Sequence, residues 1–318
     1  MKEKVLITGG AGYVGSVLTE HLVNAGFDVT VLDNLMYNQN SLLHLFHRKN
    51  FHFIYGDVRE EKLLKRIVPK FDFILPLAAI VGAPASEKHP ELMNAINFEA
   101  VAKINEIRDQ ARQKIIFPTT NSGYGTKSGD VYCTEETPLE PISAYGVSKV
   151  NAEKNLLESD NVITLRLATC FGFSPRMRLD LLVNNFVYKA IRDGYIVLFE
   201  KHFKRNYLHV RDAARCFEHC IKNFGGMKNR AYNVGLDGAN LSKEELALKV
   251  REILKRISGK EFHIQESEIG KDPDKRNYVI SNEKIMSAGF RCAYSLDDGI
   301  EELIKGYAML YDRHYTNL

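Results

Sequence analysis

The chain has 318 residues, 45% of them hydrophobic, and its formal net charge at pH 7 is +3. A chain of this length can bury a large core, and so small a positive charge without any basic block argues against a nucleic-acid partner. No apolar run reaches the length of a membrane span and no signal-peptide pattern precedes the first strand, so we expect no membrane contact and a cytoplasmic location.

Six apolar segments alternate with helical patterns and predict a doubly wound parallel sheet of the α/β class. The segments near 72–77 and 114–118 are almost continuously apolar, as is typical of strands covered on both faces. The expected strands lie near residues 4–8, 28–33, 51–55, 72–77, 114–118 and 161–167. From about residue 170 onward the pattern becomes less regular, which predicts a second, smaller lobe.

The first strand pattern breaks into glycines and then into a helix. Gly12 and Gly15 combine with either Gly9 or Gly10 in a glycine motif, and helical spacing follows. Such glycines let the backbone approach a pyrophosphate, which then rests on the amide groups at the helix N-terminus. The alternative is an ordinary strand and turn.

Asp33 ends the second strand pattern, where an acidic side chain would accept hydrogen bonds from an adenosine ribose. No Lys or Arg lies between Asp33 and His47 to pair with a 2′-phosphate, so we expect NAD rather than NADP as the cofactor. The alternative for Asp33 is a helix cap or a turn residue.

Hydroxyl side chains follow the fifth strand pattern, in the stretch 117–125. In an open α/β sheet, ligands bind at the carboxyl ends of the strands, so Thr120 and Ser122 are candidate site residues. The alternative is a turn rich in Thr and Ser.

Tyr145 and Lys149 have a spacing that puts a phenol and an ammonium on one face of a helix. The positive charge would favour the phenolate, so the pair is a candidate proton-transfer device near neutral pH. Taken alone, the spacing would be explained better by a core-edge tyrosine and a solvated lysine.

Five cysteines form no obvious disulfide framework. Cys216, His219 and Cys220 have a spacing seen in zinc sites, but the two cysteines belong to an apolar helical stripe and no second ligand cluster follows. We therefore expect buried thiols and no metal.

Together, the glycine motif, the hydroxyl cluster and the Tyr145/Lys149 pair resemble those of the extended short-chain dehydrogenase/reductases, in their nucleotide-sugar epimerase/dehydratase branch. The resemblance runs nearly end to end, through the stretches 205–212, 232–235 and 296–300. It implies a Rossmann domain over residues 1–170 and a mainly nucleotide-sugar-binding lobe over 171–318. The boundary would be interleaved, because one strand near 206–209 would return to the sheet. A catalytic triad of Thr120, Tyr145 and Lys149 is also implied.

The same resemblance implies two sets of binding residues. Around NAD, besides Tyr145 and Lys149, it places Gly9, Gly12, Tyr13, Val14, Gly15, Asp33, Asn34, Asp57, Val58, Leu77, Ala78, Ala79 and Asn97. Around the substrate it places Asn121, Ser122, Arg176, Arg178, Asn184, Arg205 and Arg276. A guanidinium binds two phosphate oxygens at once, although solvated surface positions are the alternative for these arginines.

Asn121 and Ser122 depart from the family, because 4,6-dehydratases keep an aspartate and a glutamate at these two positions. Removing a C5 proton and protonating a leaving hydroxyl need carboxyl groups, which Asn and Ser do not replace, so we expect no dehydration. Pro76 and Thr169 stand in place of a common His and Asn. We expect these two changes to alter cofactor contacts rather than the type of reaction.

The resemblance implies oxidation of a sugar C4 hydroxyl by NAD, with Tyr145 taking the proton and Thr120 bonding the same oxygen. The 4-keto sugar could then be released, be reduced on its other face by a 4-epimerase, or itself be the substrate of a reductase. The stretches 119–125 and 173–185 look closest to bacterial GDP-heptose enzymes of capsule polysaccharide synthesis, so we expect a dehydrogenase that releases the keto sugar. The alternative from another class is a non-catalytic NAD-sensing protein, which the intact triad disfavours.

In the family, the helices over 90–112 and 143–158 form a dimer interface. Ile104, Ile107, Val150 and Leu157 are apolar candidates for that interface here, or else they face the sheet. We expect a homodimer whose small-molecule partner is a nucleotide sugar.

Overall fold

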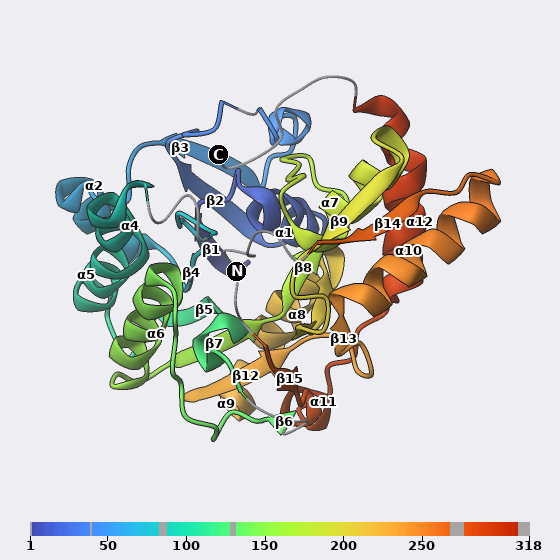
Figure 1. Ribbon diagram of the computed structural model, residues 1–318. Coiled ribbons are helices and arrows are strands. Elements are labelled where there is room, and N and C mark those ends of the chain that lie inside the picture. The colour runs from blue at the N-terminus through green and yellow to red at the C-terminus, as the bar shows by residue number, and fades with distance from the viewer. Residues whose placement is uncertain (1, 39, 83–87, 128–131, 268–276, 311–318) are drawn as a thin grey trace.

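The computed structural model describes residues 2–38, 40–82, 88–127, 132–267 and 277–310. Seven parallel strands form its central sheet in the order β12-β7-β5-β4-β1-β2-β3 (Figure 1). They are β1 (Lys4–Thr8), β2 (Asp28–Asp33), β3 (Phe51–Tyr55), β4 (Phe73–Pro76), β5 (Lys114–Thr120), β7 (Val162–Leu167) and β12 (Arg230–Val234). The predicted doubly wound sheet is confirmed, and its order reverses between β1 and β4, where such sheets bind ligands.

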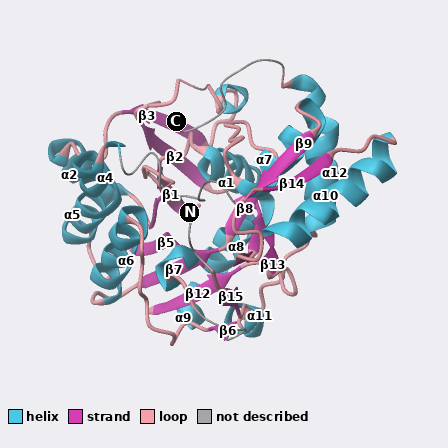
Figure 2. Cartoon of the chain, in the orientation of Figure 1, coloured by secondary structure: helices cyan, strands magenta, loops and turns pink. Residues whose placement is uncertain are grey.

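Helices cover both faces of the sheet (Figure 2). One face packs against α1 (Tyr13–Asn24) and α8 (Val210–Lys222), and the other against α2 (Glu61–Ile67), α5 (Ala100–Ile107) and α6 (Ala144–Leu157). Alternation along the strands builds both cores, because Val5 and Ile7 of β1 join the first cluster and Leu6 joins the second. The short helices α4 (Pro90–Asn94) and α9 (Phe224–Met227) precede α5 and β12.

The smaller lobe consists of strand pairs and a group of helices. The pairs are β8 (Thr169–Phe171) with β11 (Tyr207–His209), β9 (Tyr195–Leu198) with β14 (His263–Glu266), β10 (Lys204–Arg205) with β13 (Leu241–Ser242), and β6 (Tyr132–Cys133) with β15 (Val279–Ile280). The helices are α7 (Leu182–Arg192), α10 (Lys243–Ser258), α11 (Glu283–Ser287) and α12 (Leu296–Gly306). A capping box of Ser242 and Glu245 starts α10, and left-handed Gly259 ends it.

A strand forms near residues 206–209, as expected. The prediction that this strand joins the central sheet is wrong. This strand, β11, pairs with β8, whereas the strand that pairs with β7 is β12. A parallel connection needs a crossover helix, which α8 supplies, so the strand after that helix is the one that reaches the sheet. The expected division near residue 170 stays a prediction.

The four apolar residues considered for a dimer interface face this chain's own core. Ile104 and Val150 are buried within the chain, and Ile107 and Leu157 pack against the core beneath α5 and α6. The alternative interpretation of these four side chains therefore holds, and the dimer stays a prediction. In the part of the chain that the structure describes, no helix is long and apolar enough to span a membrane.

Candidate active site

A cavity of about 1350 Å³ runs along the carboxyl edge of the central sheet. Its walls come from the segments that follow β1, β2, β3, β4, β5 and β7, and from α6, α7, β9 and β10. The ends of six parallel strands therefore open into the same space. The sequence motifs on these strand ends are brought together, as predicted.

The glycine motif forms one end of the cavity. Gly9 has a φ of +71°, and a Cβ there would lie 2.5 Å from the Ala78 nitrogen. A Cβ on Gly15 would lie 2.2 Å from the Gly9 oxygen. Only glycine permits this close packing of the loop, which leaves Tyr13 and Val14, at the start of α1, lining the cavity. The residues present thus fit the pyrophosphate of a dinucleotide.

Asp33 lines the cavity at the end of β2 and also organises its own turn. Its carboxylate accepts hydrogen bonds from the backbone nitrogens of Ala11, at 2.9 Å, and Leu35, at 2.8 Å. Burial raises the pKa of Asp33, and these bonds oppose the rise. The two interpretations of Asp33, as a turn residue and as a ribose ligand, are therefore compatible in geometry.

Asn34, Asp57 and Val58 line the cavity beside Asp33. The Asn34 amide donates to the Asp57 carboxylate at 3.1 Å, and Arg59 donates to both carboxylate oxygens. These Arg59 bonds lower the pKa of Asp57 to about 2. The carboxylate is therefore ionised and fixed in place at neutral pH.

Arg176 also lies at this end, which corrects the expectation that no arginine offsets the charge of Asp33. Its guanidinium carbon is 4.2 Å from the centre of the Tyr37 ring, and its charge opposes the burial-driven rise in the pKa of Asp33. The residues between Asp33 and His47 include no arginine. Arg176 comes from the loop after β8, which no local pattern connects to β2.

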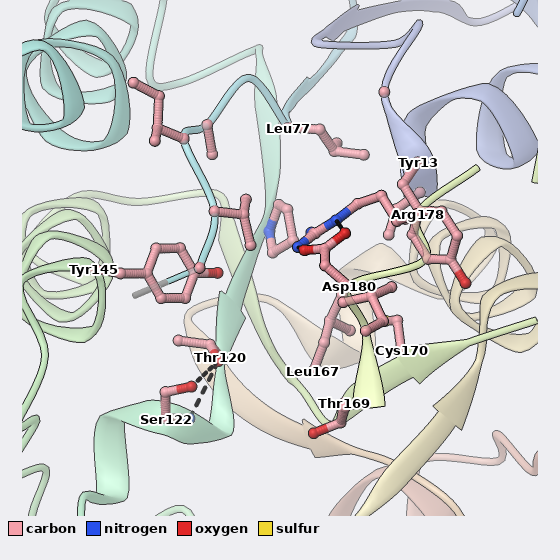
Figure 3. Close-up of a pocket in the computed structure, with 18 of the residues that line it drawn as sticks. Tyr13, Leu77, Thr120, Ser122, Tyr145, Leu167, Thr169, Cys170, Arg178 and Asp180 are labelled. Carbon is pink, nitrogen blue, oxygen red and sulfur yellow. Dashed lines mark hydrogen bonds and ion pairs between the residues drawn. The ribbon is translucent and has the colours of Figure 1, made fainter. Parts of the chain in front are cut away.

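The cavity is also lined by Thr120, Tyr145 and Lys149, which come from the end of β5 and from α6. The Thr120 hydroxyl donates to the Ser122 hydroxyl at 2.8 Å and accepts from the Ser122 nitrogen at 3.1 Å. Figure 3 shows the Tyr145 ring entering the cavity above this pair. Ser143 caps α6 by accepting from the Gly146 nitrogen, which sets the start of the helix that carries Tyr145.

The Lys149 ammonium is buried beneath this site. Its nitrogen lies 3.8 Å from the centre of the Phe117 ring. Burial lowers the pKa of Lys149 to about 7, against an opposing effect of the Glu153 charge. The ammonium is therefore poised between its charged and neutral forms near neutral pH.

Two residues expected at the site lie behind its walls instead. Asn97 accepts from the Ile80 nitrogen at 2.8 Å and donates to the Ile80 oxygen at 2.9 Å, so it positions the loop of Leu77, Ala78 and Ala79, which line the cavity. Asn121 is 1% exposed and is absent from the cavity lining, whereas Ser122 is present. A direct contact with a ligand is therefore open to Ser122 but not to these two asparagines.

The loop between β8 and α7 brings Arg178 into the centre of the cavity. Its Nε donates to the Asp180 carboxylate at 3.1 Å, and its Nη2 donates to the second oxygen. Figure 3 shows the pair between Leu77 and Tyr13, across the cavity from Tyr145.

Asn184 does not line the cavity, contrary to expectation, and its neighbour Asn185 does. Asn184 is fully buried, where it accepts from the Gly172 nitrogen at 3.0 Å and donates to the Arg178 oxygen at 2.9 Å. Adjacent helical residues point in directions that differ by about 100°, since there are 3.6 residues per turn, so an error of one position exchanges a ligand for a support. Asn184 therefore holds the loop that carries Arg178.

Basic residues also line the far end of the cavity, away from the glycine motif. Arg205, as predicted, is joined there by Lys189 and Lys243, which the sequence patterns did not single out. Lys243 donates to the Phe199 oxygen at 2.8 Å, and the Arg205 guanidinium lies 5.4 Å from the centre of the Tyr278 ring. Helix start signals predict where Lys243 lies on α10 but not that it faces a cavity. Arg276, also expected here, lies outside the described residues.

Thr169 and Cys170 line the cavity beside the triad. Burial raises the pKa of the Cys170 thiol to about 12, so it stays protonated. Cys216 and Cys220 are fully buried on α8, as expected for structural thiols. Across the described ranges, no group of three or more His, Cys, Asp or Glu side chains is arranged to hold a metal ion.

Comparison with known proteins agrees with this geometry. The family model described as "NAD dependent epimerase/dehydratase family" matches residues 5–235. The chain is 27% identical to the low-salt glycan biosynthesis protein Agl12 of Haloferax volcanii, over 95% of this chain and 98% of that protein. It is 28% identical to the uncharacterized UDP-glucose epimerase YtcB of Bacillus subtilis, over 97% of this chain and 99% of that protein. The solved UDP-glucuronic acid 4-epimerase of Bacillus cereus superposes with a TM-score of 0.83 at 23% identity, covering 97% of this chain and 100% of that chain.

Proposed function

Because the chain belongs to the NAD-dependent epimerase/dehydratase family, we propose that it oxidises the C4 hydroxyl of a nucleotide-diphosphate sugar and then returns the hydride, as a 4-epimerase. One observation supports this most strongly. Thr120, Tyr145 and Lys149 line the same continuous cavity as the glycine motif and Asp33. A dinucleotide held by the glycine motif and Asp33 would therefore present its nicotinamide to Thr120, Tyr145 and Lys149.

The residues of the site divide the work as follows. Tyr145 would remove the proton of the C4 hydroxyl, and Thr120 would hydrogen-bond the same oxygen, held in orientation by Ser122. Lys149 would stabilise the phenolate of Tyr145 whenever its ammonium is charged. NAD, when bound, supplies the hydride acceptor and afterwards the hydride donor.

The cavity wall disfavours dehydration. At the two positions after Thr120, Asn121 is buried outside the cavity and Ser122 carries only a hydroxyl. Among the described lining residues the carboxylates are Asp33, Asp57 and Asp180, of which the first two lie at the adenosine end and the third pairs with Arg178. Among the described residues that line the cavity, no carboxyl group is therefore placed next to Thr120 to remove a C5 proton.

The 4-epimerase is favoured over the release of a keto sugar, which the sequence alone favoured. YtcB, similar over almost the whole chain, is described as a UDP-glucose epimerase, and GDP-heptose appears in none of the relatives compared above. Release of a keto sugar from a GDP-heptose substrate stays a second proposal, resting on the resemblance of the stretches 119–125 and 173–185. For the substrate diphosphate we propose Arg205 with Asn185 and Lys243, at the far end of the cavity.

Nucleotide sugars deuterated at C4 distinguish these outcomes. The purified enzyme would be incubated with C4-deuterated UDP-glucose, and in parallel with GDP- and dTDP-sugars, and the products identified by NMR and mass spectrometry. An epimerase gives the C4 epimer with the deuterium retained and no net change in reduced nicotinamide. A dehydrogenase gives a 4-keto sugar and one deuterated NADH per turnover, and a dehydratase gives loss of water. Failure of every sugar to react would contradict the proposal.

A further inference from the structure

Two arginines of one short loop are buried inside the cavity. The loop 174–180 is fixed on α1, since the Ser174 hydroxyl donates to the Tyr13 oxygen at 2.7 Å and lies 2.9 Å from the Ser16 hydroxyl. Arg176 and Arg178 of this loop are 2% and 6% exposed. Arg178 pairs with Asp180, and both guanidiniums line the cavity, where a bound anion would meet two positive charges from the same loop.

The two guanidiniums lie at different points along the dinucleotide site. Arg176 stacks on Tyr37 beside Asp33, at the adenosine end. Arg178 lies near the triad, where its charge acts on Tyr13 and Tyr145 and its Nη2 is 3.8 Å from a Cβ placed on Gly82. In any dinucleotide that spans these two ends, the pyrophosphate lies between them.

The N-terminus of α1 also lines the cavity, and Figure 3 shows Tyr13 beside Arg178. Tyr13 and Val14, in the first turn of that helix, line the cavity and belong to the helix on which the loop is fixed. Burial, and to a smaller extent the charge of Arg178, lowers the pKa of Arg176 to about 10, so the two guanidiniums repel each other. An anion bound between them would reduce this repulsion further than the nearby carboxylates of Asp180 and Asp33 do.

We propose that Arg176 and Arg178 bind the pyrophosphate of NAD together with the glycine motif, so that the loop 174–180 forms a clamp that holds the cofactor at the N-terminus of α1. Both residues were expected to face the sugar, so this assigns them to another ligand. Asp180 holds Arg178 through two hydrogen bonds and competes with the phosphate for its guanidinium. The clamp rests on the proposed function only for the identity of the dinucleotide. Its consequence is a cofactor retained through the turnover, as an enzyme that returns its own hydride requires.

Binding of ADP and adenosine separates the diphosphate from the nucleoside without any turnover. The full-length chain, freed of nucleotide, would be titrated with ADP by calorimetry, and with adenosine by competition against ADP. In Arg176→Met and in Arg178→Met we expect ADP to bind at least about tenfold more weakly and adenosine to change less than about twofold, since a hydrogen bond to a charged group contributes roughly 1.5–3 kcal/mol. Arg66→Met, which removes an exposed arginine of α2, is the charge-matched control and should change neither.

Asp180→Asn tests the same clamp in the opposite direction. Removing the competing charge should tighten ADP binding and leave adenosine unchanged, a gain that a misfolded variant does not produce. Equal losses of ADP and adenosine affinity in the arginine variants, or no loss of ADP affinity, would overturn the proposal, as would weaker ADP binding by Asp180→Asn. An enzyme inactive on every sugar would still show these differences, so failure of the clamp and failure of the proposed function are distinguishable.

Discussion

Replacing Lys149 with methionine should make the protein more stable and at the same time inactive. Burial lowers the pKa of Lys149 from its ordinary value of 10.5 to about 7. At neutral pH the unfolded chain therefore binds a proton that the folded chain binds only in part, and folding must remove it. The shift of about 3.5 pKa units sets an upper limit of roughly 5 kcal/mol on this cost, at 1.36 kcal/mol per unit. Methionine has a similar shape and carries no charge, so we expect a gain of about 2 to 5 kcal/mol at pH 7.

The change of stability with pH shows whether burial of the Lys149 charge is the cause. Below pH 7 the cost is complete, and it declines as the pH rises through the window from about 7 to 10.5, because the unfolded lysine then loses its proton as well. The stability gained by Lys149→Met should therefore shrink between pH 7 and pH 10. Urea unfolding of both proteins, freed of nucleotide so that bound cofactor adds no stability, measures the difference at each pH.

A matched control lies on the same helix. Lys154 of α6 is exposed, so Lys154→Met should change the free energy of unfolding by less than about 0.5 kcal/mol at every pH. If Lys149→Met were destabilising at pH 7, or if its effect did not decline with rising pH, the argument that burial beside Phe117 penalises the charged ammonium would be refuted. Loss of activity with a gain of stability is the result we expect of a functional site that is strained for its chemistry.

Two further predictions follow from the same site, and a third concerns the oligomeric state. Tyr145→Phe should keep its cofactor, which the absorbance of the purified protein measures. Its turnover rate should fall by a factor of about 10²–10⁴, since only the proton carrier is removed. Near wild-type turnover would assign the proton transfer to another residue. Asp33→Ala should weaken NAD binding and reduce the preference for NAD over NADP, because it removes the carboxylate that would bond the ribose and repel a 2′-phosphate. Titrating both cofactors measures this, and an unchanged ratio would confine Asp33 to its turn. Asn34→Ala should change that ratio little. The chain should sediment as a homodimer at micromolar concentration, and a monomer there would contradict the family-based expectation.

The central sheet was predictable because its determinants are local. Continuous apolar runs such as 114–118 and glycines that allow a close turn act on the residues beside them, and β1, β2 and β5 form where the pattern placed them. Tyr145 and Lys149 share a helix, so their spacing alone brought them to one face.

The remaining site residues depend on contacts between distant segments. Arg176 meets Tyr37 and Asp33 only because the loop after β8 is fixed on α1 by Ser174. Lys243 reaches the cavity through the position of α10 in the smaller lobe. Asn184 and Asn185 differ by one helical position, and only the packing of α7 decides which of them faces the ligand. No periodicity carries this information, so the sequence pattern predicts neither that Arg176 lies beside Tyr37 nor that Asn184 is buried behind the cavity wall.

The late arrival of β12 has a consequence for how the chain is made. β12 pairs with β7 along its whole length, from Arg230 with Ile163 to Val234 with Leu167. During synthesis, therefore, one edge of β7 stays unpaired until α8, α9 and then β12 have been made. An open edge on an apolar strand is a template for pairing with other chains. A fragment ending near residue 170 would keep that edge permanently, so we expect it to aggregate during expression even though the glycine motif, Tyr145 and Lys149 are all present in it.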